Sequence, residues 1–262
     1  MYGKFVQIRR AKLFLWRPFL LGWYHRQQNG FVPCTVAGCD QLLYVPLEDF
    51  YESYRFFCEY PGFRDEIASF LSRLRDTEVF YDIGAFRGAF STITKMKLQQ
   101  KVAIHIFEPL PQNVEAIRRI CQRNHFEDFK INPLAVGNGQ ALAGAVNQQD
   151  FMFRPGEVDA ATAKTTFPAM SLDEYIQLGA AAPTVIKIDV EGFELEVLRG
   201  AQQCLRQNRP RLWLEVHPAF LKLQNESADD VLTFLRQIGY ATSFFNDYSP
   251  ELETSNYHVW CE

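Results

Sequence analysis

VFYDIGAFRGAFS (residues 79–91) reads as an apolar strand that breaks into a turn marked by Gly84 and Gly88. Many α/β folds use a strand, a glycine-rich turn and a helix to bring backbone close to a nucleotide cofactor. A dinucleotide-binding turn would carry G-x-G-x-x-G, but Phe86 stands where the second glycine should be, and its side chain would obstruct a diphosphate. The phosphate-loop ending G-K-[ST] is absent as well. The turn therefore predicts a nucleotide-type cofactor and disfavours both NAD and ATP.

Strand-like and helix-like segments alternate along the chain after this turn. The strand-like runs, which helical patterns separate, are VFYDI (79–83), VAIHIFE (102–108), FKINPLAV (129–136), TVIKIDV (184–190) and RLWLEV (211–216). A Gly/Ala-rich excursion over 137–170 predicts hairpin strands, and the chain closes with the strand-like runs YATSFF and NYHVWCE. Strands joined by helix-length segments require right-handed crossovers. We therefore predict one α/β domain over residues 61–262, with a mainly parallel sheet, helices on both faces and an antiparallel finish.

Residues 1–60 lie outside this alternation and predict a partly helical N-terminal extension. Its segment RRAKLFLWRPFLLGWYHR (9–26) is basic and aromatic, but Arg17 and Pro18 interrupt it, well short of the roughly 18–20 apolar residues that cross a bilayer. The segment also lacks the small-residue cleavage site of a signal peptide. We expect no transmembrane segment, and we interpret the extension as an arm that contacts the substrate, the core or a second subunit of a homo-oligomer. Peripheral contact of the arm with a membrane surface stays open.

Composition disfavours several classes of partner. The 262 residues include 27 basic and 31 acidic side chains and carry a net charge of −4 at pH 7, which is not the broad basic field of a general nucleic-acid binder. The six cysteines form no Cys-x-x-Cys pair and no Cys/His cluster, which argues against zinc and against a disulfide framework. We therefore expect reduced thiols and a cytoplasmic location.

Glu108 ends the second strand-like run, 24 residues beyond Gly84. An acid at this place accepts hydrogen bonds from ribose hydroxyls in nucleotide-binding α/β folds. Sites for NAD and for S-adenosylmethionine both use such an acid, so Glu108 alone does not choose between them.

The segments IKIDVEGFELEVLRG (186–200) and LWLEVHP (212–218) carry ionisable residues within strand-like runs. Because side chains alternate between the faces of a strand, Lys187 and Asp189 share one face, and Glu215 and His217 repeat the arrangement. Neighbouring strands would bring all of these side chains together near their carboxyl ends. Burying them without partners would cost several kcal/mol. The group is therefore either a working polar site beside the cofactor or a self-contained ion-pair network, and we favour the first.

Taken together, these motifs resemble the FkbM family of S-adenosylmethionine-dependent methyltransferases. The resemblance covers roughly residues 76–218 and depends on VFYDIGAFRGAFS, IHIFEPLPQNVEAIRR, NPLAVG, IKIDVEGFELEVLRGA and LWLEVHP, in the family's order and spacing. It implies a class I methyltransferase (Rossmann-like) fold, with a seven-stranded sheet in the order 3-2-1-4-5-7-6 and an antiparallel seventh strand. It also implies O-methylation of a hydroxyl on a small molecule or glycan, such as a sugar, a glycolipid or a polyketide-type product.

The resemblance also assigns roles to single residues. It implies that the methionine end of S-adenosylmethionine is surrounded by Asp82, Gly84, Ala85 and Gly88. It implies that Glu108 binds the ribose. The second motif of the family, which this sequence matches, includes Pro109 and Asn113. It brings the adenine close to Ala135 and Val136. The family more often has Asn at the position of Phe86 and a small or hydrophobic residue at that of Arg87, so the polar contacts of this turn are expected to differ.

Methyl transfer to a hydroxyl requires alignment of the reacting atoms and removal of a proton. His217 is the natural general base, because the unperturbed pKa of histidine is about 6.5. Asp189 is its rival, and Lys187 and Glu215 complete the expected catalytic set. A third route is a divalent ion such as Mg²⁺, held by Asp189, Glu191 and Glu215, which would lower the pKa of the hydroxyl. The spacing permits a metal but does not require one.

Three other functions stay open at this point. A non-catalytic interaction scaffold would have no need of the acids at 82, 108 and 189. An NAD-dependent oxidoreductase is disfavoured by the missing second glycine. A methyltransferase acting on a macromolecule would keep the same chemistry, although the acidic net charge argues against nucleic acid as the acceptor.

Overall fold

The computed structural model describes residues 30–36, 39, 41–54, 61–99, 102–147, 153–154, 162–245 and 256–262. The expectations for the basic segment 9–26 therefore lie outside the described residues. Within the described part of the chain, no helix has the length and apolar character needed to cross a bilayer.

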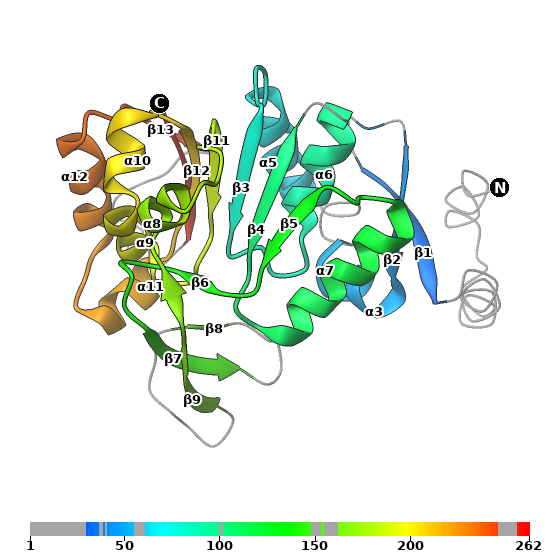
Figure 1. Ribbon diagram of the computed structural model, residues 1–262, viewed down its shortest axis with the longest axis horizontal. Helices are drawn as coiled ribbons and strands as arrows, with labels where there is room; N and C mark the ends of the chain where they lie inside the picture. Colours follow the sequence, from blue (N-terminus) through cyan, green and yellow to red (C-terminus); the bar gives the residue numbers. More distant parts are fainter. Residues whose placement is uncertain are drawn as a thin grey trace.

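A seven-stranded sheet forms the centre of the molecule (Figure 1). Its strands, in chain order, are β3 (Val79–Ile83), β4 (Ala103–Phe107), β5 (Phe129–Asn132), β11 (Val185–Ile188), β12 (Arg211–Val216), β13 (Thr242–Phe245) and β14 (Tyr257–Cys261). Their order across the sheet is β13-β14-β12-β11-β3-β4-β5. Strand β14 runs antiparallel to both of its neighbours, and the pairs from β12 to β5 are parallel. This arrangement confirms the strand order and the antiparallel finish expected from the sequence.

Helices cover both faces of this sheet, as expected. One face packs against α5 (Pro61–Ser72), α6 (Ala89–Leu98) and α7 (Pro111–Asn124). The other face packs against α8 (Leu172–Gln177), α9 (Glu194–Gly200), α10 (Gln202–Gln207) and α12 (Ala228–Gln237). Strand side chains alternate between the two cores: Phe80 contributes to the first and Tyr81 to the second. The apolar residues on both faces of each central strand explain why these runs read as almost continuously hydrophobic.

Local capping signals set several helix boundaries. Ser171 and Ser227 each form a capping box with the third residue of α8 and α12, and Pro111 occupies the first turn of α7. Within residues 191–208, α9 begins at Glu194, and Ala201 separates it from α10. The break follows Gly200, where an added Cβ would lie 1.8 Å from the carbonyl oxygen of Gly137, so the backbones touch there.

The described part of the N-terminal extension packs against the central domain. Strands β1 (Phe31–Thr35) and β2 (Leu42–Pro46) form an antiparallel hairpin, followed by the short helices α3 (Leu47–Asp49) and η1 (Phe50–Tyr54). The hairpin lies beside α7 (Figure 1), where the side chain of Asn124 bonds to both the amide and the carbonyl of Tyr44. Val32, Leu43 and Tyr54 belong to the same core as the sheet. The domain division at residue 60 stays a prediction.

Two small sheets cover the carboxyl ends of the central strands. Strand β6 (Ala135–Val136) pairs in parallel with β10 (Ala169–Met170). The excursion expected over 137–170 forms an antiparallel three-stranded sheet from β7 (Leu142–Asn147), β8 (Phe153–Arg154) and β9 (Thr162–Phe167), in the order β8-β7-β9. The cysteines of the described part, at positions 34, 39, 121, 204 and 261, are free thiols. Helix α11 (Pro218–Leu221) and the 3₁₀ turn η3 (Lys222–Gln224) follow the end of β12.

Candidate functional site

The turn between β3 and α6 brings two parts of the sheet edge into contact. Gly84 has φ +74°, and an added Cβ would lie 1.8 Å from the carbonyl oxygen of Asp189 at the end of β11. Only glycine allows this approach, since both the conformation and the space exclude a side chain. The amides of Gly84 and Ala85 donate to the carbonyl of Phe107, at 3.0 and 3.3 Å. The turn thus joins the ends of β3, β4 and β11.

Phe86 adopts a left-handed backbone conformation, with φ +50°. Glycine and asparagine tolerate this region best, whereas a bulky side chain is strained there. The preference for Asn at this position, which the resemblance implied, therefore has a backbone reason. The conformation points the Phe86 amide at Glu108, whose Oε2 accepts its hydrogen bond at 2.8 Å.

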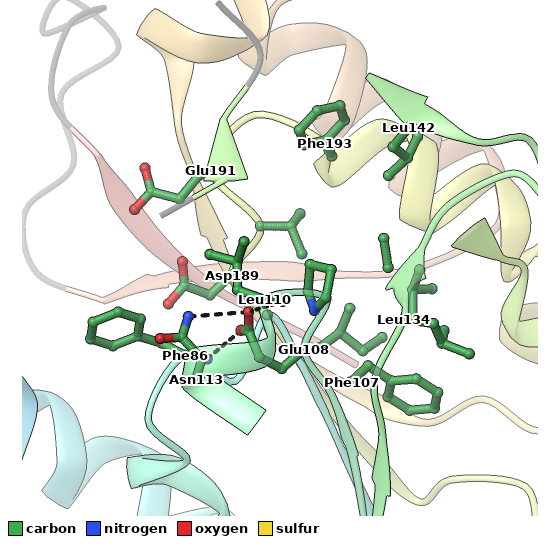
Figure 2. A pocket seen from close by; sticks show the side chains of 16 residues that line it. Phe86, Phe107, Glu108, Leu110, Asn113, Leu134, Leu142, Asp189, Glu191 and Phe193 are labelled. Atoms are coloured by element: carbon green, nitrogen blue, oxygen red, sulfur yellow. Dashed lines mark hydrogen bonds between the residues drawn. The ribbon is translucent and has the colours of Figure 1, made fainter. Parts of the chain in front are cut away.

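Glu108 is the buried carboxylate at the centre of this edge. Its Oε1 accepts from the amide of Leu110 at 3.0 Å and from Nδ2 of Asn113 at 3.2 Å (Figure 2). Burial raises the pKa of Glu108 to about 7, because the hydrogen bonds from these amides do not fully offset the loss of water. A carboxylate has about four acceptor positions, and three are used by these donors and by Phe86. The fourth position leaves capacity for one ligand hydroxyl.

A cleft with about 710 Å³ of empty space, part of it open to solvent, runs along the carboxyl edge of the strands. Figure 2 shows that Asp189, Glu191 and Phe86 lie toward one end, whereas Phe107, Leu134, Leu142 and Phe193 lie toward the other. One end of the cleft is acidic and the other apolar, with Glu108 between them. This division suits a ligand that has an aromatic ring at one end and polar groups at the other.

The structure divides the expected site residues into two groups. Those that line the cleft are Gly84, Glu108, Pro109, Asn113, Ala135, Val136, Asp189 and Glu191. Those that do not line it are Asp82, Ala85, Gly88, Lys187, Glu215 and His217. Asp82 is fully buried, and its Oδ2 accepts from the amide of Ser91 at 3.0 Å and from its hydroxyl at 2.6 Å. It therefore fixes the first turn of α6, and the direct cofactor contact assigned to it stays a prediction.

Sequence reasoning missed most of the apolar lining. Phe193 is the last residue of the motif IKIDVEGF, so its position after the turn was a usable signal. Leu134 lies in the motif NPLAVG, directly before Ala135, so it too could have been found. Leu142 comes from β7, and no local pattern in the sequence connects it to the cleft.

Behind the acidic end of the cleft lies a cluster of ionisable side chains, which we call the polar cluster. Its members are Lys187, Asp189, Glu194, Glu215 and His217. Lys187 Nζ lies 2.9 Å from Asp189 Oδ2 and 3.8 Å from Asp82 Oδ1. Burial alone would lower the pKa of Lys187, but Asp189 and Asp82 outweigh it and raise that pKa. Lys187 is thus a buried cation that faces Asp189. The structure brings together the four residues that the sequence predicted to gather, and it adds Glu194.

His217 is held between two carboxylates. Its Nδ1 lies 2.7 Å from Glu194 Oε1, and its Nε2 lies 3.4 Å from Glu215 Oε1. Burial alone would lower the pKa of His217, but its bonds to Glu194 and Glu215 raise that pKa well above the ordinary value. The pKa of Glu215 is driven well below its ordinary value, because bonds to His217 and His258 outweigh burial. His217 is therefore a buried imidazolium at neutral pH.

Asp189, Glu215 and His217 also form a group with metal-binding geometry. One ligand atom from each lies within 4.8 Å of the others, among the described residues. Glu191, which the sequence suggested as a ligand, does not belong to this group, although its Oε2 lies 3.9 Å from His217 Nε2. Glu194 would orient His217 from behind, as carboxylates behind metal-binding histidines do.

A family model described as "Methyltransferase FkbM domain" matches residues 82–242, more than half of the chain. The chain belongs to the FkbM methyltransferase family. This FkbM chain is 27% identical over 153 residues to "Hexuronic acid methyltransferase AglP" from Haloferax volcanii, an alignment that covers 55% of this chain and 59% of that protein. Among solved structures, it resembles an FkbM methyltransferase from Methylobacillus flagellatus KT, with 18% identity and a TM-score of 0.51.

The structural likeness covers 82% of this FkbM chain and 54% of the solved one. The chain thus spans little more than half the length of the relatives it matches. The likeness and the strand order together identify the class I methyltransferase fold. The family match begins at Asp82, so the hairpin β1-β2, α3, η1 and α5 all lie outside it.

Proposed function

We propose that the chain is an S-adenosylmethionine-dependent O-methyltransferase that acts on a hydroxyl of a small molecule or glycan. The observation that carries the proposal is that Glu108 and Asp189 line the same cleft, at strand ends that the Gly84 turn joins. Membership of the FkbM family supports the chemistry. The hexuronic acid named in the relative's description supports a sugar as the acceptor.

The cleft residues fit the proposed cofactor. When bound, S-adenosylmethionine supplies a methyl group already activated by its sulfonium. The remaining acceptor position on Glu108 suits a ribose hydroxyl. Phe107, Leu134, Ala135 and Val136 form an apolar wall suited to an adenine ring. The turn at Gly84 leaves room beside its backbone for the methionine end.

Asp189 is the better placed of the two candidate bases. Its Oδ2 faces Lys187, while its side chain is 26% exposed and lines the cleft. His217 is only 1% exposed and is already protonated at neutral pH. In the proposed mechanism, the cofactor would supply its methyl group to the acceptor oxygen, and Asp189 Oδ1 would accept the hydroxyl proton. Lys187 holds the carboxylate in place, and Glu215 with His217 supports it from behind.

A second route uses a divalent cation such as Mg²⁺. The mutual approach of Asp189, Glu215 and His217 within 4.8 Å favours it. Such an ion would bind the acceptor hydroxyl and ease its loss of a proton. Dialysis against EDTA separates the two routes. The metal route requires loss of transfer that Mg²⁺ or Mn²⁺ restores, and the Asp189 route requires no change.

The function is tested by incubating the purified chain with S-adenosylmethionine and a panel of acceptors. The panel contains free hexuronic acids, hexuronic-acid oligosaccharides, neutral sugars, glycolipids and polyketide-type alcohols, and mass spectrometry detects methylated products. A base-stable product identifies an ether, whereas a base-labile one identifies a carboxyl ester and overturns the hydroxyl assignment. Calorimetry adds a check on the class of protein. No binding of S-adenosylmethionine at millimolar concentration would favour the non-catalytic scaffold.

The remaining expectations stay predictions. They are a macromolecular acceptor as the alternative substrate, a homo-oligomer, contact between the N-terminal arm and a membrane surface, and a cytoplasmic location. The NAD-dependent alternative loses support, because the side chain of Phe86 lines the cleft at the place where a diphosphate would need bare backbone.

A further inference from the structure

The turn that carries Phe86 is tied to a segment outside the family match. This segment, Leu47–Tyr54, consists of α3 and η1, and we call it the anchoring segment. Asp49 Oδ1 lies 3.1 Å from Nη1 of Arg87, and the two side chains are 1% and 9% exposed. The Tyr54 hydroxyl donates to the carbonyl of Arg87 at 3.0 Å. The anchoring segment therefore holds Arg87 by its side chain and by its backbone.

Arg87 in turn constrains Phe86. The guanidinium lies over the Phe86 ring, with Cζ 5.3 Å from the ring centroid. Phe86 has the left-handed φ of +50° that a bulky residue adopts only under backbone strain. Such strain persists where the surroundings fix the conformation. Here the surroundings are the neighbouring residue, Arg87, and the two buried groups that hold it.

The same conformation determines the position of the ribose acceptor. The Phe86 amide donates to Glu108 Oε2 at 2.8 Å, and both residues line the cleft. If the turn relaxed to an ordinary backbone conformation, this amide would point elsewhere. Glu108 Oε2 would then lose a donor, and the Phe86 ring would leave its place in the wall.

We propose that Asp49 and Tyr54 are positioning residues for S-adenosylmethionine, acting through Arg87 to keep Phe86 and Glu108 in their binding arrangement. The inference rests on the proposed function, because it concerns the same cleft. It explains the arginine that departs from the family pattern at position 87: its charge is matched by a buried aspartate from the anchoring segment. The cofactor site thus extends beyond the region that the family match covers.

The first experiment measures the affinity for S-adenosylmethionine by calorimetry in Asp49→Asn and Tyr54→Phe. The matched control is Glu48→Gln, which breaks the exposed ion pair between Glu48 and Arg119 in the same short helix. We expect each test variant to bind S-adenosylmethionine about tenfold more weakly than wild type, because release of the backbone strain at Phe86 would have an effect of this size. The control should bind with wild-type affinity. Wild-type affinity in both test variants, in protein that is fully folded by circular dichroism, overturns the proposal.

A second variant separates positioning from stability. Replacing a buried ion pair with apolar residues of similar size is often neutral or stabilising, so the double variant Asp49→Leu/Arg87→Met should fold even if Asp49→Asn does not. If the pair of Asp49 and Arg87 only stabilised the fold, the folded double variant would bind S-adenosylmethionine with wild-type affinity. That result would contradict the proposal. We expect weaker binding at unchanged stoichiometry, with KM for S-adenosylmethionine raised more than kcat is lowered.

Rescue provides the last test. Asn tolerates the left-handed conformation without outside support, so in a Phe86→Asn background the substitution Asp49→Asn should weaken binding less than it does in wild type. Equal effects in the two backgrounds would mean that Asp49 does not act through Phe86.

The titration of wild type with S-adenosylmethionine distinguishes failure of this inference from failure of the proposed function. If wild type itself fails to bind S-adenosylmethionine, the proposed function fails. If wild type binds and the test variants match Glu48→Gln, only this inference fails.

Discussion

Two carboxylates on the same edge of the sheet, Glu108 and Glu215, have pKa values that are shifted in opposite directions. Glu108 is surrounded by neutral amide donors, and burial raises its pKa to about 7. Glu215 contacts two imidazoles, and its pKa lies well below the ordinary value. Burial penalises both anions, but only cationic partners outweigh that penalty. The β4 end of the edge is therefore nearly neutral and suited to an uncharged ribose, while the β12 end is permanently ionised.

The largest expected effect tests the ionised end. Asp189→Asn removes the proposed proton acceptor and keeps its size. We expect kcat to fall by about 10²–10⁴-fold, the usual range for loss of a general base. The affinity for S-adenosylmethionine should change little by calorimetry, because Glu108 lies apart from the substitution. A wild-type rate would exclude Asp189 both as base and as metal ligand.

The next prediction concerns the glycine that joins the two ends. Gly84→Ala would place a Cβ 1.8 Å from the Asp189 carbonyl in a residue with φ +74°. We expect a loss of about 2–5 kcal/mol in the free energy of unfolding, measured by urea denaturation. Gly62→Ala is the matched control, because that glycine lies in α5 with nothing within 4 Å of an added Cβ. It should be neutral or slightly stabilising. A smaller loss at Gly84 than at Gly62 would mean that the two strand ends separate easily.

The next prediction concerns the pH dependence of S-adenosylmethionine binding at the Glu108 end of the cleft. A ribose hydroxyl bonds best to an ionised Glu108, so affinity for S-adenosylmethionine should strengthen as pH rises through about 7. Between pH 6 and pH 8 we expect about a tenfold gain, the ratio of ionised fractions on either side of that pKa. Calorimetry of Glu108→Gln over the same range should give a flat profile. An equally steep profile in the variant would assign the titration to another group.

The same raised pKa affects stability in the opposite direction. A carboxyl whose folded pKa exceeds its unfolded value near 4.5 binds more protons when folded, so stability falls as pH rises from about 4.5 to about 7 and is then constant. Glu66 shows the same direction, with a pKa raised to about 7 mainly by burial. The effects of Glu108 and Glu66 on the pH dependence of stability are therefore complete near neutral pH. Changes in stability at higher pH can then be assigned to the histidines.

The smallest expected effect is the change in stability above neutral pH to which His217 contributes. Its pKa is raised in the folded state, so its stabilising contribution is complete below about pH 6.5 and is lost as pH rises through the folded pKa. Titration of His217 should therefore cost the wild type up to about 2 kcal/mol of stability between pH 7.5 and pH 9. In His217→Asn the loss should be smaller but still present, because the pKa of His258 is raised as well. Urea denaturation at both pH values measures it, and identical slopes would mean that His217 is neutral when folded.

Regular strands and capped helices could be predicted from the sequence, because local signals determine them. Strands β3 and β12 have the bounds that their apolar runs predicted. The close approach of Gly200 to the carbonyl oxygen of Gly137 could not be predicted, since Gly137 lies far away in the chain. The expected FkbM membership is confirmed by the family match.

Within the site, Glu194 shows what a closer reading could have found. It lies three and four residues before Val197 and Leu198, on the buried stripe of α9, so its carboxylate had to face inward. The contact of Asp49 with Arg87 gave no such signal. The two residues belong to different elements, and only the packed structure brings them together.

The position of β14 has a consequence for how the molecule is made. Strand β13 precedes β14 in the chain, yet it joins the sheet only through β14, which lies between it and β12. During synthesis, residues 242–245 therefore have no strand to pair with until residues 257–261 have left the ribosome. Until then β12 presents an open edge, which is the kind of surface that promotes aggregation of nascent chains. A truncation before Tyr257 should accordingly accumulate as insoluble protein, even though the cleft residues would all be present.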